Sequence, residues 1–177
     1  SRAEGGERNE HLFFRKEFNL TTEPSKAELN LYADARYALY VNEVYVNFGP
    51  ARSFHAHPYY DTYDLRPYLK PGKNVIAVQA LCNGMLTYQL VDYHSAFTTW
   101  GEIEAGAERI DLDIEEGWLS RASTGYDKSA PRFSFATGPM EIWDSRSEGD
   151  WDAMETATGD WKEPVPITDQ KRFGTFS

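Results

Sequence analysis

Two stretches of the chain are rich in aromatic side chains of the kind that bind sugars. They are residues 52–60 (RSFHAHPYY) and residues 83–100 (NGMLTYQLVDYHSAFTTW). A flat ring can stack on the apolar face of a pyranose, while amides and carboxylates around the ring bind the hydroxyl groups. Gln89 and Asp92 supply such polar groups in the second stretch. The residues that we predict as carbohydrate-binding candidates are His55, His57, Tyr59, Tyr60, Asn83, Tyr88, Tyr93, His94 and Trp100.

Two short segments carry carboxylates that could bind calcium. A calcium ion takes about 6–8 oxygen ligands, some of them backbone carbonyls on a loop. Asp61 and Asp64 lie in one segment, and Asp150 and Asp152 lie in the other. The EF-hand spacing is absent, and neither segment is singled out by its pattern. We therefore predict no cofactor, and a structural calcium ion is the alternative that the sequence leaves open.

The remaining reactive residue types form no catalytic pattern. Cys82 is the only cysteine, so no intrachain disulfide can form, and we expect a buried, inert thiol at the end of an apolar run. Glycoside hydrolysis requires two carboxyl groups at a set separation. The acidic residues within 111–116 alternate with apolar ones, so we expect them to face solvent. The sequence also lacks a Gly-x-Ser-x-Gly elbow and a glycine-rich phosphate loop. It predicts no catalytic residue.

The elements that must position these side chains are strands. Apolar residues recur at every second position in several short runs, which is the period of a half-buried strand. One run is apolar nearly throughout and follows Pro71-Gly72, as expected of a central strand. The predicted strands are residues 27–33, 37–41, 44–46, 74–81, 100–104, 110–114, 118–122 and 141–144.

Turns join these strands, and helical signal is sparse. Asn42-Glu43 predicts a tight hairpin, because Asn tolerates the positive φ of such a turn, although Glu43 stands where Gly would be easier. Asp64 is expected to cap a single turn over residues 65–68, and a second turn is expected at 152–158. Short strands with Gly, Pro, Asn and Asp between them predict an all-β fold, an antiparallel β-sandwich of the jelly-roll type.

Composition excludes several classes of partner. The chain has 177 residues, with 18 Lys and Arg against 28 Asp and Glu, which gives a net charge of −10. This surplus argues against nucleic acid and anionic membranes, since both require a basic face. No apolar run approaches the roughly 20 residues that span a bilayer, and no signal peptide is visible. The length suits one domain, and the compartment is left open between cytoplasm and periplasm.

A set of motifs in a fixed order resembles a known family. The longest motif is residues 60–78 (YDTYDLRPYLKPGKNVIAV). The others are residues 14–18 (FRKEF), 33–34, 37–42 (YALYVN), 49–52, 118–121 (WLSR), 142–146 (IWDSR) and 160–167. Together they resemble the N-terminal β-sandwich of bacterial α-L-rhamnosidases, a glycoside hydrolase family. This resemblance implies a galactose-binding-domain-like fold.

The resemblance also implies a domain that is not itself an enzyme. Catalysis in these inverting enzymes, which hydrolyse terminal α-L-rhamnosides, belongs to a large helical barrel for which 177 residues leave no room. The implied organisation is a flexible lead at 1–12, the β-sandwich at 13–167, and a linker or tail toward a missing domain at 168–177. The implied partners are the catalytic domain of the same parent chain and a rhamnose-containing saccharide.

Two functions for such an accessory domain remain open. The first is carbohydrate binding by the aromatic stretches. The second is a purely structural interface that positions the catalytic barrel without binding sugar, and it predicts a contiguous exposed apolar patch. The aromatic candidates fit either function, because rings can also close the ends of a sandwich.

Overall fold

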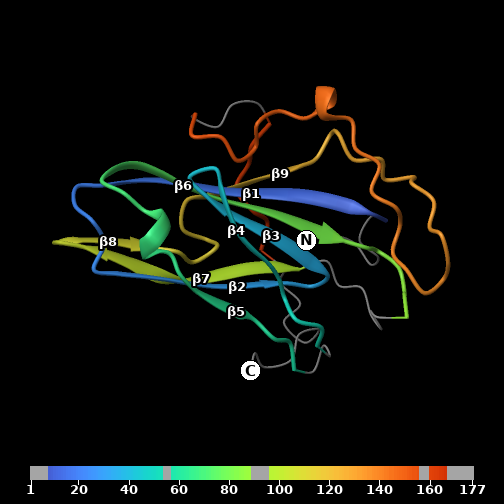
Figure 1. Cartoon of the computed structure of the whole chain (residues 1–177), viewed down its shortest axis with the longest axis horizontal. Helices are drawn as coiled ribbons and strands as arrows, with labels where there is room; N and C mark the ends of the chain where they lie inside the picture. The colour runs from blue at the N-terminus through green and yellow to red at the C-terminus, as the bar shows by residue number, and fades with distance from the viewer. Residues whose placement is uncertain (1–7, 54–56, 89–95, 156–159, 167–177) are drawn as a thin grey trace.

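Two antiparallel sheets pack face to face in the computed structural model, which describes residues 8–53, 57–88, 96–155 and 160–166 (Figure 1). Sheet A has the strand order β4-β3-β6-β1-β9, and sheet B has the order β5-β2-β7-β8. The predicted β-sandwich is therefore confirmed. The elements are β1 (Glu10–Leu20), β2 (Lys26–Ala33), β3 (Arg36–Val41), β4 (Val44–Gly49), β5 (Asp61–Asp64), the 3-10 helix η1 (Arg66–Tyr68), β6 (Gly72–Cys82), β7 (Phe97–Ala105), β8 (Glu108–Asp111), β9 (Trp118–Ala122) and the 3-10 helix η2 (Ser145–Ser147).

Most of the predicted strands are present, and two differ. The predicted strand at 110–114 ends early, because β8 stops at Asp111. Beyond that point Leu112 and Ile114 still donate backbone hydrogen bonds to β7, at 2.9 and 3.1 Å. The prediction of a strand at 141–144 is wrong: Trp143 forms only an isolated bridge with Tyr126, so no ladder extends on either side.

The hairpin between β3 and β4 has the predicted turn. Asn42 and Glu43 have φ values of 51° and 67°, the left-handed conformation that a two-residue hairpin loop needs. Asn42 also donates from Nδ2 to the Tyr68 carbonyl at 2.8 Å. Glu43 has a partner as well, since its Oε1 accepts the Met154 N–H at 2.9 Å. The side chain at this strained position therefore holds a distant segment.

The single turn predicted after Asp64 is the 3-10 helix η1. Its N-cap is Leu65, while Asp64 accepts a hydrogen bond from the backbone N–H of Arg66 at 3.1 Å. Leu65 and Leu69 on either side are buried in the core. The turn predicted at 152–158 is irregular as far as residue 155, and residues 156–159 lie outside the described part of the chain.

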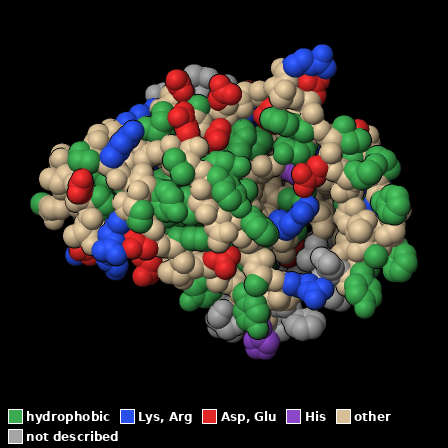
Figure 2. Space-filling view, viewed as in Figure 1, with side chains coloured by type: hydrophobic (Ala, Val, Ile, Leu, Met, Phe, Trp, Pro, Cys, Tyr) green, Lys and Arg blue, Asp and Glu red, His purple; other side chains and the backbone are tan. Residues whose placement is uncertain are grey.

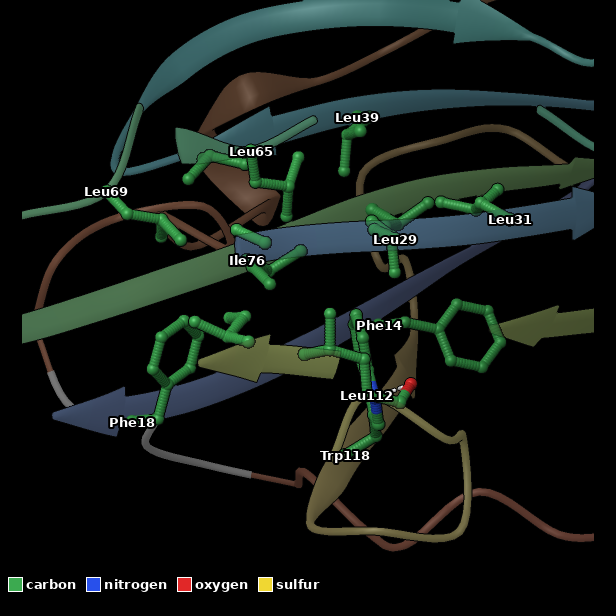
Figure 3. Packing of buried hydrophobic residues seen from close by; sticks show 14 of the residues in the cluster. Phe14, Phe18, Leu29, Leu31, Leu39, Leu65, Leu69, Ile76, Leu112 and Trp118 are labelled. Carbon is green, nitrogen blue, oxygen red and sulfur yellow. Dashed lines mark hydrogen bonds between the residues drawn. The ribbon is translucent and has the colours of Figure 1, made fainter. Parts of the chain in front are cut away.

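The hydrophobic core fills the space between the sheets (Figure 3). Leu29 and Leu31 of β2 face Ile76 of β6 and Phe14 of β1 across this space. Trp118 is buried at the start of β9, and its indole N–H donates to the Leu112 carbonyl at 3.1 Å. Cys82 is buried, as expected of an inert thiol. No helix in the described part of the chain is long and apolar enough to cross a membrane.

A third layer covers the outer face of sheet A. We call residues 123–155 the covering segment; Figure 1 shows the chain after β9, in yellow to orange, looping around one end of the sheet and returning above β1. Trp151 stacks on Phe13 and meets Tyr40 edge-on, with ring centroids 4.5 and 5.2 Å away. The Arg15 guanidinium donates to the carbonyls of Trp151 and Glu155. The central strands β1 and β6 of sheet A are therefore buried on both faces.

The contacts with the covering segment include residues that precede the predicted start of the domain at residue 13. Strand β1 begins at Glu10, inside residues 1–12, which the sequence assigned to a flexible lead. Asn9 and His11 are buried, because Asn9 donates to the Asp127 carbonyl at 2.9 Å and His11 stacks on Tyr126. The predicted tail at 168–177 lies outside the described residues.

Candidate functional site

The outer face of sheet B carries a group of aromatic and polar side chains near the start of β5. The register places Trp100 of β7 opposite Asn30 of β2, and Asn30 opposite Thr62 of β5. This row points away from the core, because the flanking residues Leu29 and Leu31 point into it. Asn30, Tyr32, Tyr60, Thr62 and Trp100 are called the aromatic face below.

Two rings in this group contact each other. The centroids of Tyr60 and Trp100 lie 4.8 Å apart, with the ring planes at 59°, and both side chains are half-buried. The position of Trp100 depends on the next residue: a Cβ at Gly101, whose φ is 137°, would lie 2.1 Å from the Glu28 carbonyl oxygen. β7 therefore approaches β2 closely at this point, and only glycine permits it.

Hydrogen bonds fix the polar groups between the rings. Thr62 donates from Oγ1 to Asn30 Oδ1 at 2.6 Å, and Asn30 Nδ2 donates to Glu28 Oε1 at 3.3 Å. Burial, followed by the nearby charge of Asp34, raises the pKa of Tyr32. The face combines ring surfaces with an oriented amide and hydroxyl.

The opposite end of the same sheet face is charged and internally paired. Glu102 forms ion pairs with Lys26 at 2.7 Å and with Arg109 at 3.2 Å. The hydrogen bond from Lys26 is the main cause that lowers the pKa of Glu102. These charges pair with one another at the end of the sheet face away from Tyr60 and Trp100.

The structure brings together only some of the predicted carbohydrate-binding residues. Tyr60 and Trp100 form the pair described above. His57, Tyr59 and Tyr88 are exposed, with Tyr88 at 79%. His55, Tyr93 and His94 lie outside the described residues.

Asn83 does not lie on the aromatic face. It is buried beside β1, where its carbonyl accepts the Asn9 N–H at 3.1 Å and Gly138 packs against its amide. Asn30 and Thr62 were missed as site residues. The alternation within 27–33 was the available signal for Asn30, since it places Asn30 and Tyr32 on the face opposite the leucines.

Two of the carboxylates predicted to bind calcium have protein partners, and no metal-binding group forms around the others in the described part of the chain. Asp61 accepts a hydrogen bond from the Tyr37 hydroxyl, and Asp64 holds the Arg66 guanidinium at 2.6 Å. Burial raises the pKa of Asp152. Among the described residues, His, Cys, Asp and Glu side chains form no group of three or more that could hold a metal ion. Calcium binding at Asp61, Asp64, Asp150 or Asp152 stays a prediction.

Comparisons with known proteins identify the fold. No family model and no curated protein matches the sequence. A GH78 family rhamnosidase of Bacillus sp. GL1 is 29% identical with a TM-score of 0.80, over 99% of this chain and 19% of that one. The α-L-rhamnosidase from Dictyoglumus thermophilum is 19% identical with a TM-score of 0.72, over 94% and 18%. A Pleurotus ostreatus lectin is 22% identical with a TM-score of 0.50, over 82% and 40%.

The fold and these matches define a class, a β-sandwich domain carried within larger glycoside hydrolase chains. Nearly the whole of this chain is similar to one domain of GH78 α-L-rhamnosidases, as its motifs indicated. It spans about a fifth of their length, 19% and 18%. That share is consistent with a non-catalytic domain of a glycoside hydrolase.

Proposed function

We propose that this chain is a non-catalytic accessory domain of an α-L-rhamnosidase and binds carbohydrate at its aromatic face. The observation that carries the proposal is the half-buried pair of Tyr60 and Trp100, which lies beside the fixed amide of Asn30. The similarity to rhamnosidase domains supplies the context and the expected ligand, a terminal α-L-rhamnoside. The match to the lectin is a likeness of fold alone.

The chemistry of the face fits a 6-deoxy sugar. An indole ring stacks on the C–H face of a pyranose, and the methyl group of rhamnose adds apolar surface to that contact. The exposed hydroxyl of Thr62 can then exchange a hydrogen bond with a ring hydroxyl, while the buried amide of Asn30 holds the Thr62 side chain in place. The ion pairs of Glu102 lie at the other end of sheet B, and the carboxylate beside Asn30, that of Glu28, accepts the Asn30 amide N–H at 3.3 Å.

Titration calorimetry with methyl α-L-rhamnoside tests the proposal. We expect the wild-type chain to bind weakly, and Trp100→Ala and Tyr60→Ala to lower affinity by about tenfold or more. Trp143→Ala is the matched control, since Trp143 is 53% exposed and lies on the covering segment. Wild-type binding that survives both substitutions, or no binding by the wild type, would overturn the proposal. Hydrolysis of an aryl rhamnoside by this chain would overturn the non-catalytic assignment.

A second candidate function is the interface role, and exposed apolar residues favour it. On the edge strand β4, Tyr45 and Phe48 are 50% and 67% exposed. On the covering segment, Phe133 and Phe135 are 90% and 74% exposed. Figure 2 shows hydrophobic side chains gathered over sheet A and again at the end on the right. Such surfaces suit contact with another domain.

Co-expression of this chain with the remainder of its parent enzyme as a separate fragment tests this second function. We expect the two fragments to co-purify, and Phe133→Asp with Phe135→Asp to abolish the association. Val165→Asp is the control, because Val165 is 69% exposed and lies outside both apolar surfaces. Fragments that remain separate would argue against an interface role.

A further inference from the structure

Polar side chains line the open side of the sandwich, where the edge strands β4 and β5 meet. Asn47 pairs with Leu39 in sheet A, and Asp61 and Tyr63 pair with Leu31 and Leu29 in sheet B. Their register therefore directs all three polar side chains toward the space between the sheets, at positions where the neighbouring strands bury leucine. Asn47, Asp61 and Tyr63 are called the edge cluster below.

Hydrogen bonds connect the two strands through this cluster. Asn47 Nδ2 donates to the Tyr63 hydroxyl at 3.4 Å, and the hydroxyls of Tyr63 and Tyr37 lie 2.6 Å apart. Tyr37 is buried in the core, and its own hydroxyl donates to Asp61 Oδ2. The Tyr37 hydroxyl occupies Asp61 Oδ2, and this hydrogen bond fixes the orientation of the carboxylate and so of Asp61 Oδ1.

The cluster remains accessible. Asn47 is exposed, and Asp61 and Tyr63 are half-buried. In the described part of the chain, Asp61 Oδ1 accepts no hydrogen bond, and neither does Asn47 Oδ1. Asp61 Oδ1 and Asn47 Oδ1 are therefore two acceptors at the edge of the sandwich, in side chains that are not fully buried.

Gly49 has no side chain, and this leaves room for the carboxylate of Asp61. A Cβ on Gly49 would lie 2.2 Å from Asp61 Oδ2 and 2.8 Å from the Tyr37 hydroxyl. Any other residue at this position would force the carboxylate to move. Gly49 has no left-handed φ, so backbone conformation does not explain the glycine. The space it leaves is occupied by a polar group that serves no core packing.

We propose that the edge cluster is a second carbohydrate subsite, which takes a neutral sugar with adjacent hydroxyl groups. A carboxylate oxygen and an amide together can bind two neighbouring hydroxyls, and the Tyr63 ring can contact the sugar C–H surface. Asp61 and the net charge of −10 disfavour uronates and sugar phosphates by repulsion.

This subsite is separate from the aromatic face. Tyr60 and Thr62 point to the outer face of sheet B, whereas Asp61 and Tyr63 point to the inner face, because neighbouring strand residues alternate. The inference rests on the proposed function only in taking the ligand to be a sugar. The two subsites can therefore be tested independently in the same chain.

NMR titration of the whole chain with methyl α-L-rhamnoside, and in parallel with sodium galacturonate, tests the inference. The side-chain amide of Asn47 reports on the edge cluster, and the indole of Trp100 reports on the aromatic face. We expect the neutral glycoside to shift the Asn47 signals and galacturonate to leave them unchanged. Asn47→Ala, and Gly49→Ala through displacement of Asp61, should each weaken this binding by about tenfold. Asp64→Asn is the control, because Asp64 lies on the outer face of β5 with Arg66 as its partner.

Each outcome decides between the two sites. Shifts at Trp100 alone, with Asn47→Ala binding as the wild type does, would overturn the edge subsite and leave the proposed function intact. Shifts at Asn47 alone would support the edge subsite and move sugar binding away from the aromatic face. No shift at either reporter would overturn both. Binding that is lost with a chelator and restored by calcium would assign Asp61 to a metal ion and overturn the direct contact.

Discussion

The indole of Trp151 stacks on the ring of Phe13, with centroids 4.5 Å apart and planes at 15°. Phe13 lies on the outer face of β1 and has no exposed surface, because Trp151 covers it. Arg121 also lies near this ring, with its guanidinium carbon 5.1 Å from the centroid. One contact therefore joins residues far apart in sequence and turns sheet A into the middle layer of three.

Replacing Trp151 by alanine should uncover β1. We expect the free energy of unfolding to fall by about 2 kcal/mol, because the ring stack is lost and Phe13 becomes exposed. Urea denaturation followed by circular dichroism measures this change. Phe133→Ala is the matched control: Phe133 is 90% exposed, so its removal should cost less than about 0.5 kcal/mol. Equal costs for the two variants would contradict the covering role of residues 123–155.

The covering segment also explains why part of the fold could not be predicted from the sequence. In β2, Leu29 and Leu31 alternate with Asn30, because only one face of that strand is buried, and the strand was predicted. In β1, Phe13 and Phe14 are both buried, so the alternation disappears and no strand was predicted there. Trp151, which covers Phe13, belongs to a segment whose apolar residues follow no regular spacing.

The same reason limits what could be known of the site. Tyr60 and Trp100 were selected by residue type, and the two residues lie 40 positions apart in the chain. Whether they meet depends on the pairing of β2 with both β5 and β7, which no local pattern specifies. Asn83 was predicted as a carbohydrate-binding residue, but the backbone hydrogen bond from Asn9 holds it at the buried end of sheet A.

Glu148 should be the most sensitive carboxylate of the covering segment. Its side chain is 1% exposed, pairs with Arg121 at 2.7 Å and accepts the Gly125 N–H at 3.1 Å. Glu148→Gln leaves the Arg121 charge without its partner, so we expect a loss of about 3 kcal/mol in the free energy of unfolding. Glu141→Gln should cost about 0–1 kcal/mol, because the ion pair of Glu141 with Arg36 is more than half exposed. Chemical denaturation of both variants compares them, and a cost below about 1 kcal/mol for Glu148→Gln would show that the pair is dispensable.

Glu43 should reveal two opposing effects at the hairpin. Its φ of 67° favours glycine, whereas its carboxylate accepts the Met154 N–H at 2.9 Å. Glu43→Ala loses the hydrogen bond and keeps the strain, while Glu43→Gly loses the bond and relieves the strain. We expect Glu43→Gly to be more stable than Glu43→Ala by about 1 kcal/mol. Hydrogen exchange should show faster exchange of the Met154 amide in both variants, and an unchanged rate would mean that Glu43 does not hold that segment.

His11 should make the stability of the domain depend on pH. Its ring stacks on Tyr126 with centroids 3.6 Å apart, and its Nδ1 lies 3.1 Å from Gln79 Nε2. Burial, followed by the charge of Arg36, lowers the pKa of His11 from 6.5 to about 4. The unfolded chain therefore binds a proton more readily than the folded chain between these two values. The stabilisation is complete above pH 6.5 and is lost as the pH falls through this range.

Replacing His11 by phenylalanine should remove this dependence while keeping a ring against Tyr126. Between about pH 7.5 and about pH 4.5, we expect the free energy of unfolding of the wild type to fall further than that of His11→Phe, by on the order of 2 kcal/mol. Urea titrations of both proteins at the two pH values measure the difference, and an NMR titration of the His11 ring gives its folded pKa directly. Parallel pH profiles for the two proteins would show that protonation of His11 does not oppose folding.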